Sequence, residues 1–158
     1  MSNKISRNTF TMINPPTIHS YAAVVGKKEG EGPLSSCFDR IEEDSYFGQD
    51  TWEKAESELQ KQTVELALSK VKLIPENVDF MFAGDLLNQC IGSTYALKDL
   101  NIPLLGIYGA CSTMAEGLLL SSIMTDNGLG GNIIAVTSSH FCTAERQFRL
   151  PLSYGGQR

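Results

Sequence analysis

The residue with the clearest chemical potential in this sequence is Cys111, within Leu104-Leu-Gly-Ile-Tyr-Gly-Ala-Cys-Ser-Thr-Met-Ala-Glu-Gly-Leu118. The segment reads as a buried strand, a turn of small residues and the start of an apolar helix. This order puts the cysteine beside the unpaired N–H groups of a helix N-terminus, where the helix dipole favours negative charge. Such a position suits two chemistries: a thiolate nucleophile or a bound anion such as a carboxylate.

Covalent catalysis by Cys111 would need a base to take the thiol proton and hydrogen-bond donors to hold an oxyanion. Neither can be identified within the 158 residues. Gly109 is expected to serve the sharp turn before Ala110, and Ser112 and Thr113 to occupy the first helical turn. We therefore assign Gly109, Ala110, Cys111 and Ser112 to ligand binding, with Cys111 catalytic only if the protein is an active enzyme.

Further candidates follow two other apolar segments that are predicted to be strands. Asp85, Asn88 and Gln89 come after one, and His140 comes after the other. Ligands of open α/β sheets bind outside the carboxyl ends of the strands, so Asp85, Asn88 and His140 are interpreted as ligand-binding residues. Turn and helix-start roles explain Asp85 and Asn88 equally well, and a plain loop histidine is the alternative for His140.

Charged side chains near the expected site are few. Arg146, Arg149 and Arg158 are the cations there, and a guanidinium pairs with a carboxylate in bidentate fashion. At most one of the three is expected to contact a ligand, and Arg149 is taken as that residue. Glu116 is the charge inside an apolar helix, and we interpret it as a structural acid because a buried carboxylate needs a partner.

The composition is that of a folded globular chain, with 42% hydrophobic and 20% charged residues and a net charge of −5. The negative charge argues against nucleic-acid binding, which needs a basic face. Four scattered cysteines without CxxC or Cys/His spacing predict no metal site and reduced thiols. Without a secretory leader or a segment long enough to span a bilayer, we expect a soluble, intracellular protein.

Hydrophobic periodicity and turn residues predict strands alternating with helices. The predicted strands are 17–25, 78–83, 102–108 and 133–137, the helices are 51–72, 87–100 and 112–125, and a long loop (26–50) and an extended tail (141–158) complete the chain. Asp50 is expected to cap helix 51–72 at its N-terminus. Glu56 is expected to lie on the side of this helix that faces water. This alternation predicts right-handed crossovers and a largely parallel sheet.

Helix 112–125 is apolar on most sides, which is typical of a helix buried between two layers. A single sheet covers only one of its faces. A second half of the fold or a partner subunit is therefore expected to cover the other face.

Several motifs occur in an order that resembles the stage V sporulation protein AD family, within the thiolase/ketoacyl synthase superfamily. They are Gly48-Gln-Asp50, Ala83-Gly-Asp-Leu86 with Asn88-Gln89, Gly109-Ala-Cys-Ser-Thr113, Ser138-Ser-His140, Glu145 with Gln147-Phe-Arg149, and Tyr154-Gly-Gly-Gln157. The resemblance runs from about residue 18 to the end of the sequence. It places Cys111 where thiolases and ketoacyl synthases keep their nucleophile.

The resemblance implies an α/β, thiolase-like fold, of which this chain is the N-terminal half. That half is a mixed, largely parallel sheet with a buried helix layer. Residues 1–16 would form an N-terminal extension and residues 17–158 the thiolase-like half-domain. A second, similar half would carry the catalytic His residues, or His and Asn, of the active superfamily members, and it is absent from this sequence.

The function implied by the resemblance is that of a non-catalytic subunit. It would bind dipicolinic acid, alone or with calcium, for uptake into the developing spore, and would need no cofactor. The alternatives are an acyl-transferring condensing enzyme with a Cys111 nucleophile, or a scaffold subunit with a vestigial pocket. The implied partners are a second copy, met along strand 133–138, and other proteins of the spore dipicolinate transport apparatus. Those proteins would hold it at the spore inner membrane.

Overall fold

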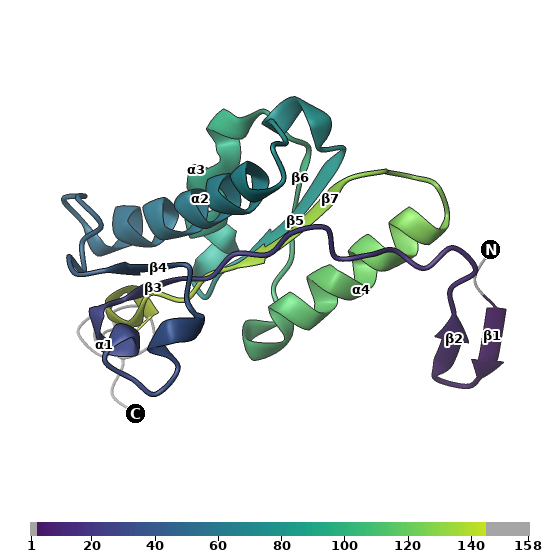
Figure 1. The fold of residues 1–158 in the computed structure, drawn as a ribbon, viewed down its shortest axis with the longest axis horizontal. Helices are drawn as coiled ribbons and strands as arrows, with labels where there is room; N and C mark the ends of the chain where they lie inside the picture. Colours follow the sequence, from purple (N-terminus) through teal and green to yellow (C-terminus); the bar gives the residue numbers. More distant parts are fainter. Residues whose placement is uncertain (1–2, 145–158) are drawn as a thin grey trace.

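The computed structural model describes residues 3–144, which form an α/β fold (Figure 1). Its elements are β1 (Asn3–Ser6), β2 (Thr9–Thr11), β3 (Val24–Gly26), α1 (Lys27–Gly30), β4 (Arg40–Glu42), α2 (Trp52–Lys70), β5 (Phe80–Gly84), α3 (Ile91–Leu97), β6 (Leu104–Gly106), α4 (Thr113–Asp126) and β7 (Ile133–Thr137). Short 3-10 turns at Ser35–Cys37, Pro75–Asn77, Asn88–Cys90, Lys98–Leu100 and Ala110–Ser112 join some of them.

The central sheet has the strand order β6-β5-β7, and both pairings are parallel. Helices α2 and α3 pack against each other on one face of this sheet, and α4 packs on the opposite face against β5 and β7 (Figure 1). Each parallel connection passes through a helix. The predicted parallel sheet with crossover helices is therefore confirmed.

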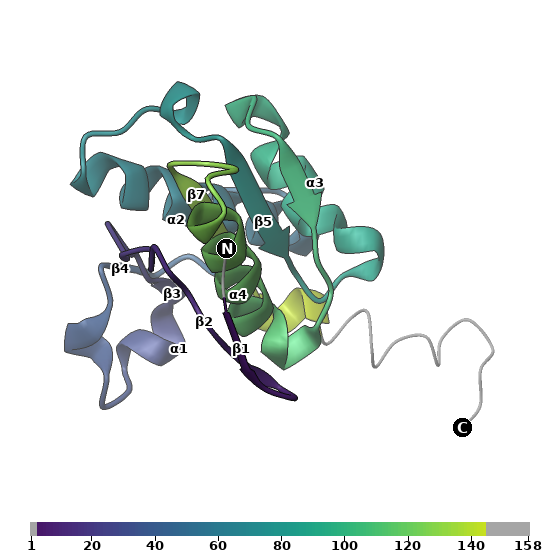
Figure 2. The ribbon, with the colours of Figure 1, turned by 90° about the vertical axis from the view of Figure 1, so that its right-hand side faces the viewer.

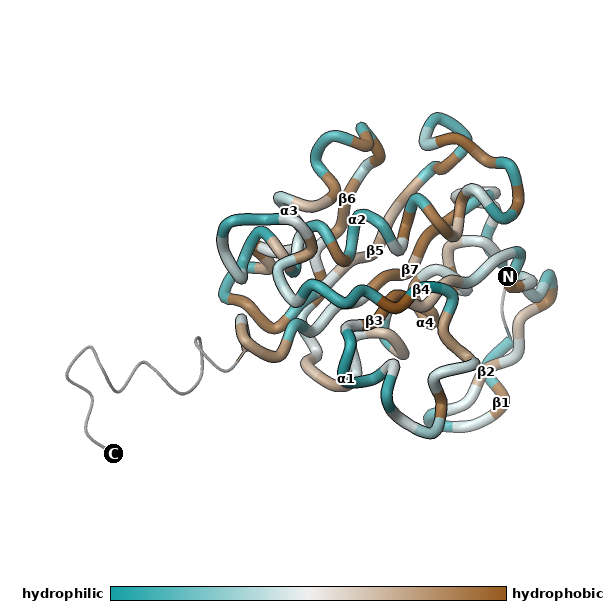
Figure 3. The backbone as a smooth tube through the Cα atoms, turned by 60° about the vertical axis from the view of Figure 1, so that its left-hand side comes forward, coloured by the Kyte–Doolittle hydropathy of each residue, from teal (hydrophilic) through white to brown (hydrophobic). Residues whose placement is uncertain are grey.

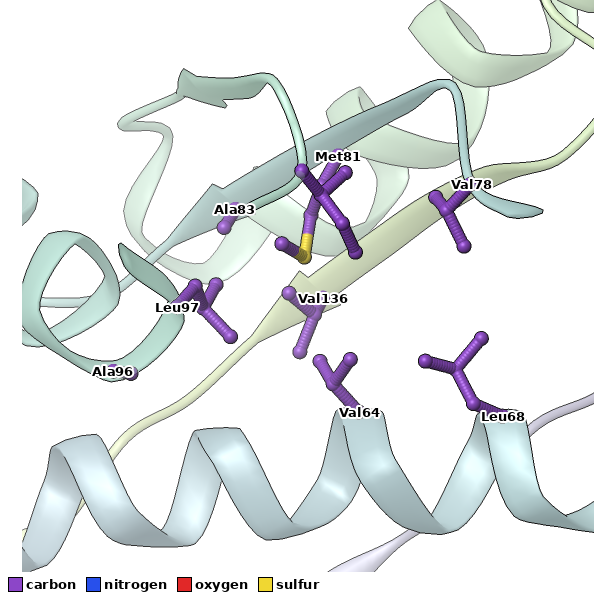
Figure 4. Close-up of a cluster of buried hydrophobic side chains, with 9 residues drawn as sticks. Val64, Leu68, Val78, Met81, Ala83, Ala96, Leu97 and Val136 are labelled. Atoms are coloured by element: carbon purple, nitrogen blue, oxygen red, sulfur yellow. The ribbon is translucent and has the colours of Figure 1, made fainter. Parts of the chain in front are cut away.

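The main hydrophobic core lies between α2, α3 and the sheet (Figure 4). It consists of Val64, Leu68, Val78, Met81, Ala83, Ala96, Leu97, Ile102 and Val136. β5 is covered on both faces, which explains its continuous apolar sequence. Figure 3 shows β5 and β7 as mainly hydrophobic segments at the centre of the molecule. A smaller cluster of Val24, Phe47 and Ala55 packs near the first turn of α2.

The start of α2 differs from the prediction. Thr51 is the N-cap, because its side-chain oxygen accepts a hydrogen bond from the Lys54 amide at 3.3 Å while its own backbone is extended. The Asp50 carboxylate lies 2.8 Å from the Lys54 ammonium on the surface instead. The capping role predicted for Asp50 is wrong by one residue, although the helix itself is confirmed.

The N-terminal part of the chain also departs from the prediction. Residues 3–11 form an antiparallel hairpin, β1–β2, that projects from the body (Figure 2). The strand predicted at 17–25 is reduced to β3. β3 pairs in parallel with β4, a strand that lies within the segment 26–50 predicted to be a loop. Residues before β3 are fastened by side chains instead: the Asn14 amide bonds to Asp126 Oδ1 at 2.6 Å and Ser20 Oγ to the Ala67 carbonyl at 2.7 Å.

Helix α4 is confirmed, but among the described residues only its sheet-facing side is covered. Gly117 lies on that side, where an added Cβ would be 3.2 Å from Ala135 Cβ. Met114, Leu118 and Leu119 remain 39–47% exposed. Gly128, with φ +71°, ends the helix in the left-handed conformation expected of a C-terminal cap.

None of the described helices has the length and hydropathy needed to cross a bilayer.

Candidate ligand-binding turn at the carboxyl end of the sheet

The turn that carries Cys111 follows β6 directly and leads into α4. Ala110 has φ +47°, a left-handed conformation that is rare for a residue with a side chain. The Ser112 amide and hydroxyl both donate to the Gly109 carbonyl, at 2.9 and 2.7 Å. These bonds tighten the chain into a 3-10 turn whose tip, Cys111 and Ser112, is exposed at the N-terminal end of a fourteen-residue helix.

Two glycines permit this turn. A Cβ on Gly109 would lie 2.6 Å from Ser112 Oγ and 2.8 Å from Glu116 Oε2, so the ends of these two side chains would have to shift. A Cβ on Gly84, at the end of β5, would lie 2.2 Å from the Ile107 carbonyl oxygen and 2.6 Å from Thr113 Cγ2. The predicted part of Gly109 in bringing the backbone close to a ligand stays a prediction.

The segment after β5 lies beside the Cys111 turn. Cys90 Sγ donates to the Ile107 carbonyl at 3.3 Å, and the Tyr108 hydroxyl donates to the Leu86 carbonyl at 3.5 Å. Asn88 and Gln89 are exposed on this segment. The structure thus brings the segment that bears Asn88 next to the turn, as the sheet topology predicts.

Asp85 is buried, and both of its oxygens have partners within the protein. Oδ1 accepts from the Leu87 amide at 2.9 Å, and Oδ2 accepts from the Ser93 amide and hydroxyl at 2.7 and 2.6 Å. These bonds fasten the start of α3 to the end of β5, which is the turn and helix-start role considered above. Burial and the negative charge of Asp85 together raise the pKa of the Cys90 thiol.

A buried polar cluster, here called the Glu56 cluster, lies at the carboxyl ends of β5 and β7. It consists of Glu56, Gln60, Asp85, Ser93 and Ser138. Ser138 Oγ donates to Glu56 Oε1 at 2.9 Å, and Gln60 Nε2 reaches the Ser93 hydroxyl at 3.1 Å and the Gly84 carbonyl at 3.3 Å. Glu56 is fully buried at 0% exposure, so the prediction that it faces water is wrong.

Glu56 is the most strongly perturbed acid of the site. Burial raises its pKa from 4.5 to about 7, against the hydrogen bond from Ser138 and with a further contribution from the charge of Asp85. Within residues 3–144, neither Glu56 Oε2 nor Gln60 Oε1 has a hydrogen-bond partner. A proton on Glu56 therefore suits this surrounding, because a carboxylate buried without a partner is costly.

His140 is buried, but its ring belongs to a different set of contacts from the Cys111 turn. Nε2 lies 2.7 Å from the Ser45 carbonyl, and the ring stacks at a tilt on Trp52, 5.6 Å between centroids. Phe47 approaches the ring edge-on, and Tyr46 covers the far side of Trp52. Among the contacts of the described residues, none joins His140 to residues 109–112. Its pocket role stays a prediction.

The remaining sequence predictions concern three arginines, Glu116 and metal ligands. Arg146, Arg149 and Arg158 lie outside the described residues. Glu116 is half-buried beside Gly109, and nothing observed decides its role. Within residues 3–144, no group of three or more His, Cys, Asp or Glu side chains is placed to hold a metal ion.

The Glu56 cluster was missed from the sequence although a signal for it exists. Glu56, Gln60, Val64 and Leu68 recur every four residues and so share one face of α2. The last two are core residues, which places the first two on the core face. The charge of Glu56 led to the opposite interpretation.

The parallel sheet, with the Cys111 turn leading into a helix on one of its faces, has the arrangement of a thiolase-like fold. The solved 3-oxoacyl-[acyl-carrier-protein] synthase III from Aquifex aeolicus VF5 has a similar fold, with a TM-score of 0.50 and 18% sequence identity. The match covers 56% of this chain and 30% of that one. The likeness concerns the fold alone, and it confirms the predicted thiolase-like fold.

Within this class, the sequence model described as "Stage V sporulation protein AD (SpoVAD)" matches residues 6–158. Stage V sporulation protein AD of Bacillus subtilis (strain 168) is 41% identical over 152 residues, covering 96% of this chain and 45% of that protein. The chain belongs to the stage V sporulation protein AD family, as the motifs predicted. It spans about half the length of this curated relative.

Proposed function

We propose that this chain supplies part of a binding site for dipicolinic acid, free or as its calcium chelate, in a non-catalytic sporulation protein. The protein would serve uptake of dipicolinic acid into the developing spore. The observation that carries the proposal is the exposed turn of Cys111 and Ser112 at the N-terminal end of α4. The N-terminal end of a fourteen-residue helix favours a carboxylate through the helix dipole, and dipicolinic acid offers two carboxylates.

The surroundings of Cys111 support binding without turnover. Within residues 3–144 the Cys111 thiol makes no hydrogen bond, and the His140 ring lies against the Ser45 carbonyl instead. Nucleophilic catalysis needs a base within hydrogen-bond reach of the thiol. A bound carboxylate needs none.

Calorimetry on the intact protein tests the proposal. Dipicolinic acid should bind saturably with and without Ca²⁺, and benzene-1,3-dicarboxylic acid, which lacks the ring nitrogen, should bind more weakly. G84A should weaken binding about tenfold or more, the effect of losing one hydrogen bond to a carboxylate, because a Cβ there would lie 2.2 Å from the Ile107 carbonyl oxygen and would displace the segment that leads into the turn. G26A is the matched control, because a Cβ there meets nothing within 4 Å. Absence of saturable binding would overturn the proposal.

A second candidate is acyl transfer through Cys111, which the exposure of this thiol at a helix start favours. Incubation with acyl-CoA followed by peptide mass spectrometry tests it. A thioester on Cys111, lost in C111S, would support an acyltransferase. A protein that neither binds dipicolinic acid nor forms this adduct would be a scaffold with a vestigial pocket.

We further propose a homodimer that meets along β7. In the described sheet β7 pairs with β5 on one side and forms the sheet edge on the other. Two copies of an edge strand can pair about a two-fold axis. Light scattering during size-exclusion chromatography should give a dimer of the intact protein, and a monomer at micromolar concentration would contradict this.

Contact with the membrane would come through other proteins of the spore dipicolinate transport apparatus. The intact protein should then sediment with spore inner membranes when those proteins are present and remain in the supernatant when they are removed. Sedimentation that does not depend on them would contradict this.

A further inference from the structure

Thr113 closes the Cys111 turn from inside the protein. Its side chain is 2% exposed, and its hydroxyl bonds to both sides of Ala110. It accepts from the Gly109 amide at 3.1 Å and donates to the Ala110 carbonyl at 2.8 Å. The buried Thr113 hydroxyl is thus both donor and acceptor to the backbone on the two sides of Ala110.

This bracing falls where the backbone needs it. A non-glycine residue with positive φ costs about 1 kcal/mol or more, and it persists only when its surroundings hold it there. Ala110, at φ +47°, immediately precedes Cys111. The direction of the Cys111 backbone and thiol therefore depends on what holds Ala110.

The methyl group of Thr113 fixes its rotamer against the sheet. Cγ2 packs on the end of β5, where a Cβ on Gly84 would approach within 2.6 Å. The Gly84 carbonyl in turn accepts from Gln60 Nε2, the Thr137 hydroxyl and the Ser138 amide, at 3.3, 3.1 and 3.2 Å. Thr113 is thereby seated on a part of the sheet that is itself bonded from α2 and β7.

We propose that Thr113 is a positioning residue that keeps Ala110 left-handed and so orients Cys111 and the turn for their ligand. The proposal deepens the proposed function and rests on it for the identity of the ligand. The orientation of Cys111 can be measured without any ligand, which separates the two.

The test measures how fast iodoacetamide alkylates Cys111 relative to Cys37, by peptide mass spectrometry on the intact protein. Both thiols are exposed, so Cys37 serves as an internal reference. T113V removes the hydroxyl and keeps the shape, whereas T113S keeps the hydroxyl. The Cys111/Cys37 ratio should fall about two- to fivefold in T113V, the effect of one helix-terminus interaction, and stay at the wild-type value in T113S. T63V, which removes a hydroxyl bonded within α2, is the matched control.

A second variant separates positioning from plain stability. Glycine adopts positive φ without strain, so A110G/T113V should fold and restore the wild-type ratio. A ratio unchanged in T113V, equally lowered in T113S, or not restored in A110G/T113V would overturn the proposal. If T113V does not fold, the double variant decides alone, and its failure to fold would also overturn the proposal. Loss of dipicolinic acid binding by the wild type would refute only the proposed function.

Discussion

Replacing the buried acid of α2 should change how the protein's stability depends on pH. The pKa of Glu56 is raised to about 7 from 4.5, chiefly by burial. Between these two pH values the folded state keeps a proton that the unfolded state has released. Stability must therefore fall as pH rises through this window, and it levels off once both states are ionised.

The size of the effect follows from the same two values. Each unit of difference between the folded and unfolded pKa corresponds to about 1.4 kcal/mol. The shift of Glu56 from 4.5 to about 7 therefore lowers the free energy of unfolding of the wild type by about 3 kcal/mol above pH 7. E56Q keeps an acceptor for Ser138 and cannot ionise. We expect the free energy of unfolding of E56Q to rise relative to wild type by about 3 kcal/mol between pH 4.5 and 8.

Urea unfolding of the intact protein at pH 5, 6, 7 and 8 measures this difference. The pKa values of Asp39, Asp44 and Asp50 are lowered by hydrogen bonds, so these acids stabilise the fold above their unfolded pKa and act below this window. Contributions of groups that titrate alike in both proteins cancel in the difference. E65Q, on the exposed face of the same helix, is the control. Parallel curves for E56Q and wild type from pH 5 to 8 would refute the reasoning.

Four further substitutions test the fold around the site by urea unfolding. D85N should cost about 2–3 kcal/mol, because it weakens the charged bonds to Ser93, and a loss under 0.5 kcal/mol would contradict this. T51A should lower the free energy of unfolding by about 1 kcal/mol through loss of the N-cap, and D50A should lower it less. The reverse order would support Asp50 as the cap of α2. M81A should cost about 2–5 kcal/mol from the cavity left in the main core, so a nearly neutral change would show that this core is loosely packed.

The sequence predicts the long, strongly patterned elements well. α2, α4 and β7 lie within two residues of their predicted bounds. α2 has apolar residues at helical spacing, and α4 and β7 are mainly apolar runs that end at polar residues. β4 is three residues long and lies in the polar segment predicted as a loop, which leaves no period to recognise, and β3 keeps only the end of the strand predicted at 17–25. They exist because each supplies the other's backbone partners across an intervening loop.

The candidate site was predictable where it is local and not where it depends on distant pairs. The Cys111 turn follows from consecutive residues of one segment. The partner of His140 is Ser45, 95 positions away, and no local pattern links them. Glu56 was misplaced because its type outweighed its spacing, and the cost of burying it is met by Ser138 and by protonation rather than by exposure.

The unpaired side of α4 bears directly on how the site works. Met114, Leu118 and Leu119 are half-exposed, and the first of these lies three residues after Cys111. Whatever covers Met114 must also border the Cys111 turn, because Met114 lies in the first turn of α4. A cover that excludes water would strengthen every electrostatic interaction of the helix N-terminus with a bound carboxylate. We therefore expect L118D, which puts a charge on that face away from the turn, to weaken dipicolinic acid binding by the intact protein. Unchanged binding in L118D would show that the turn works without this cover.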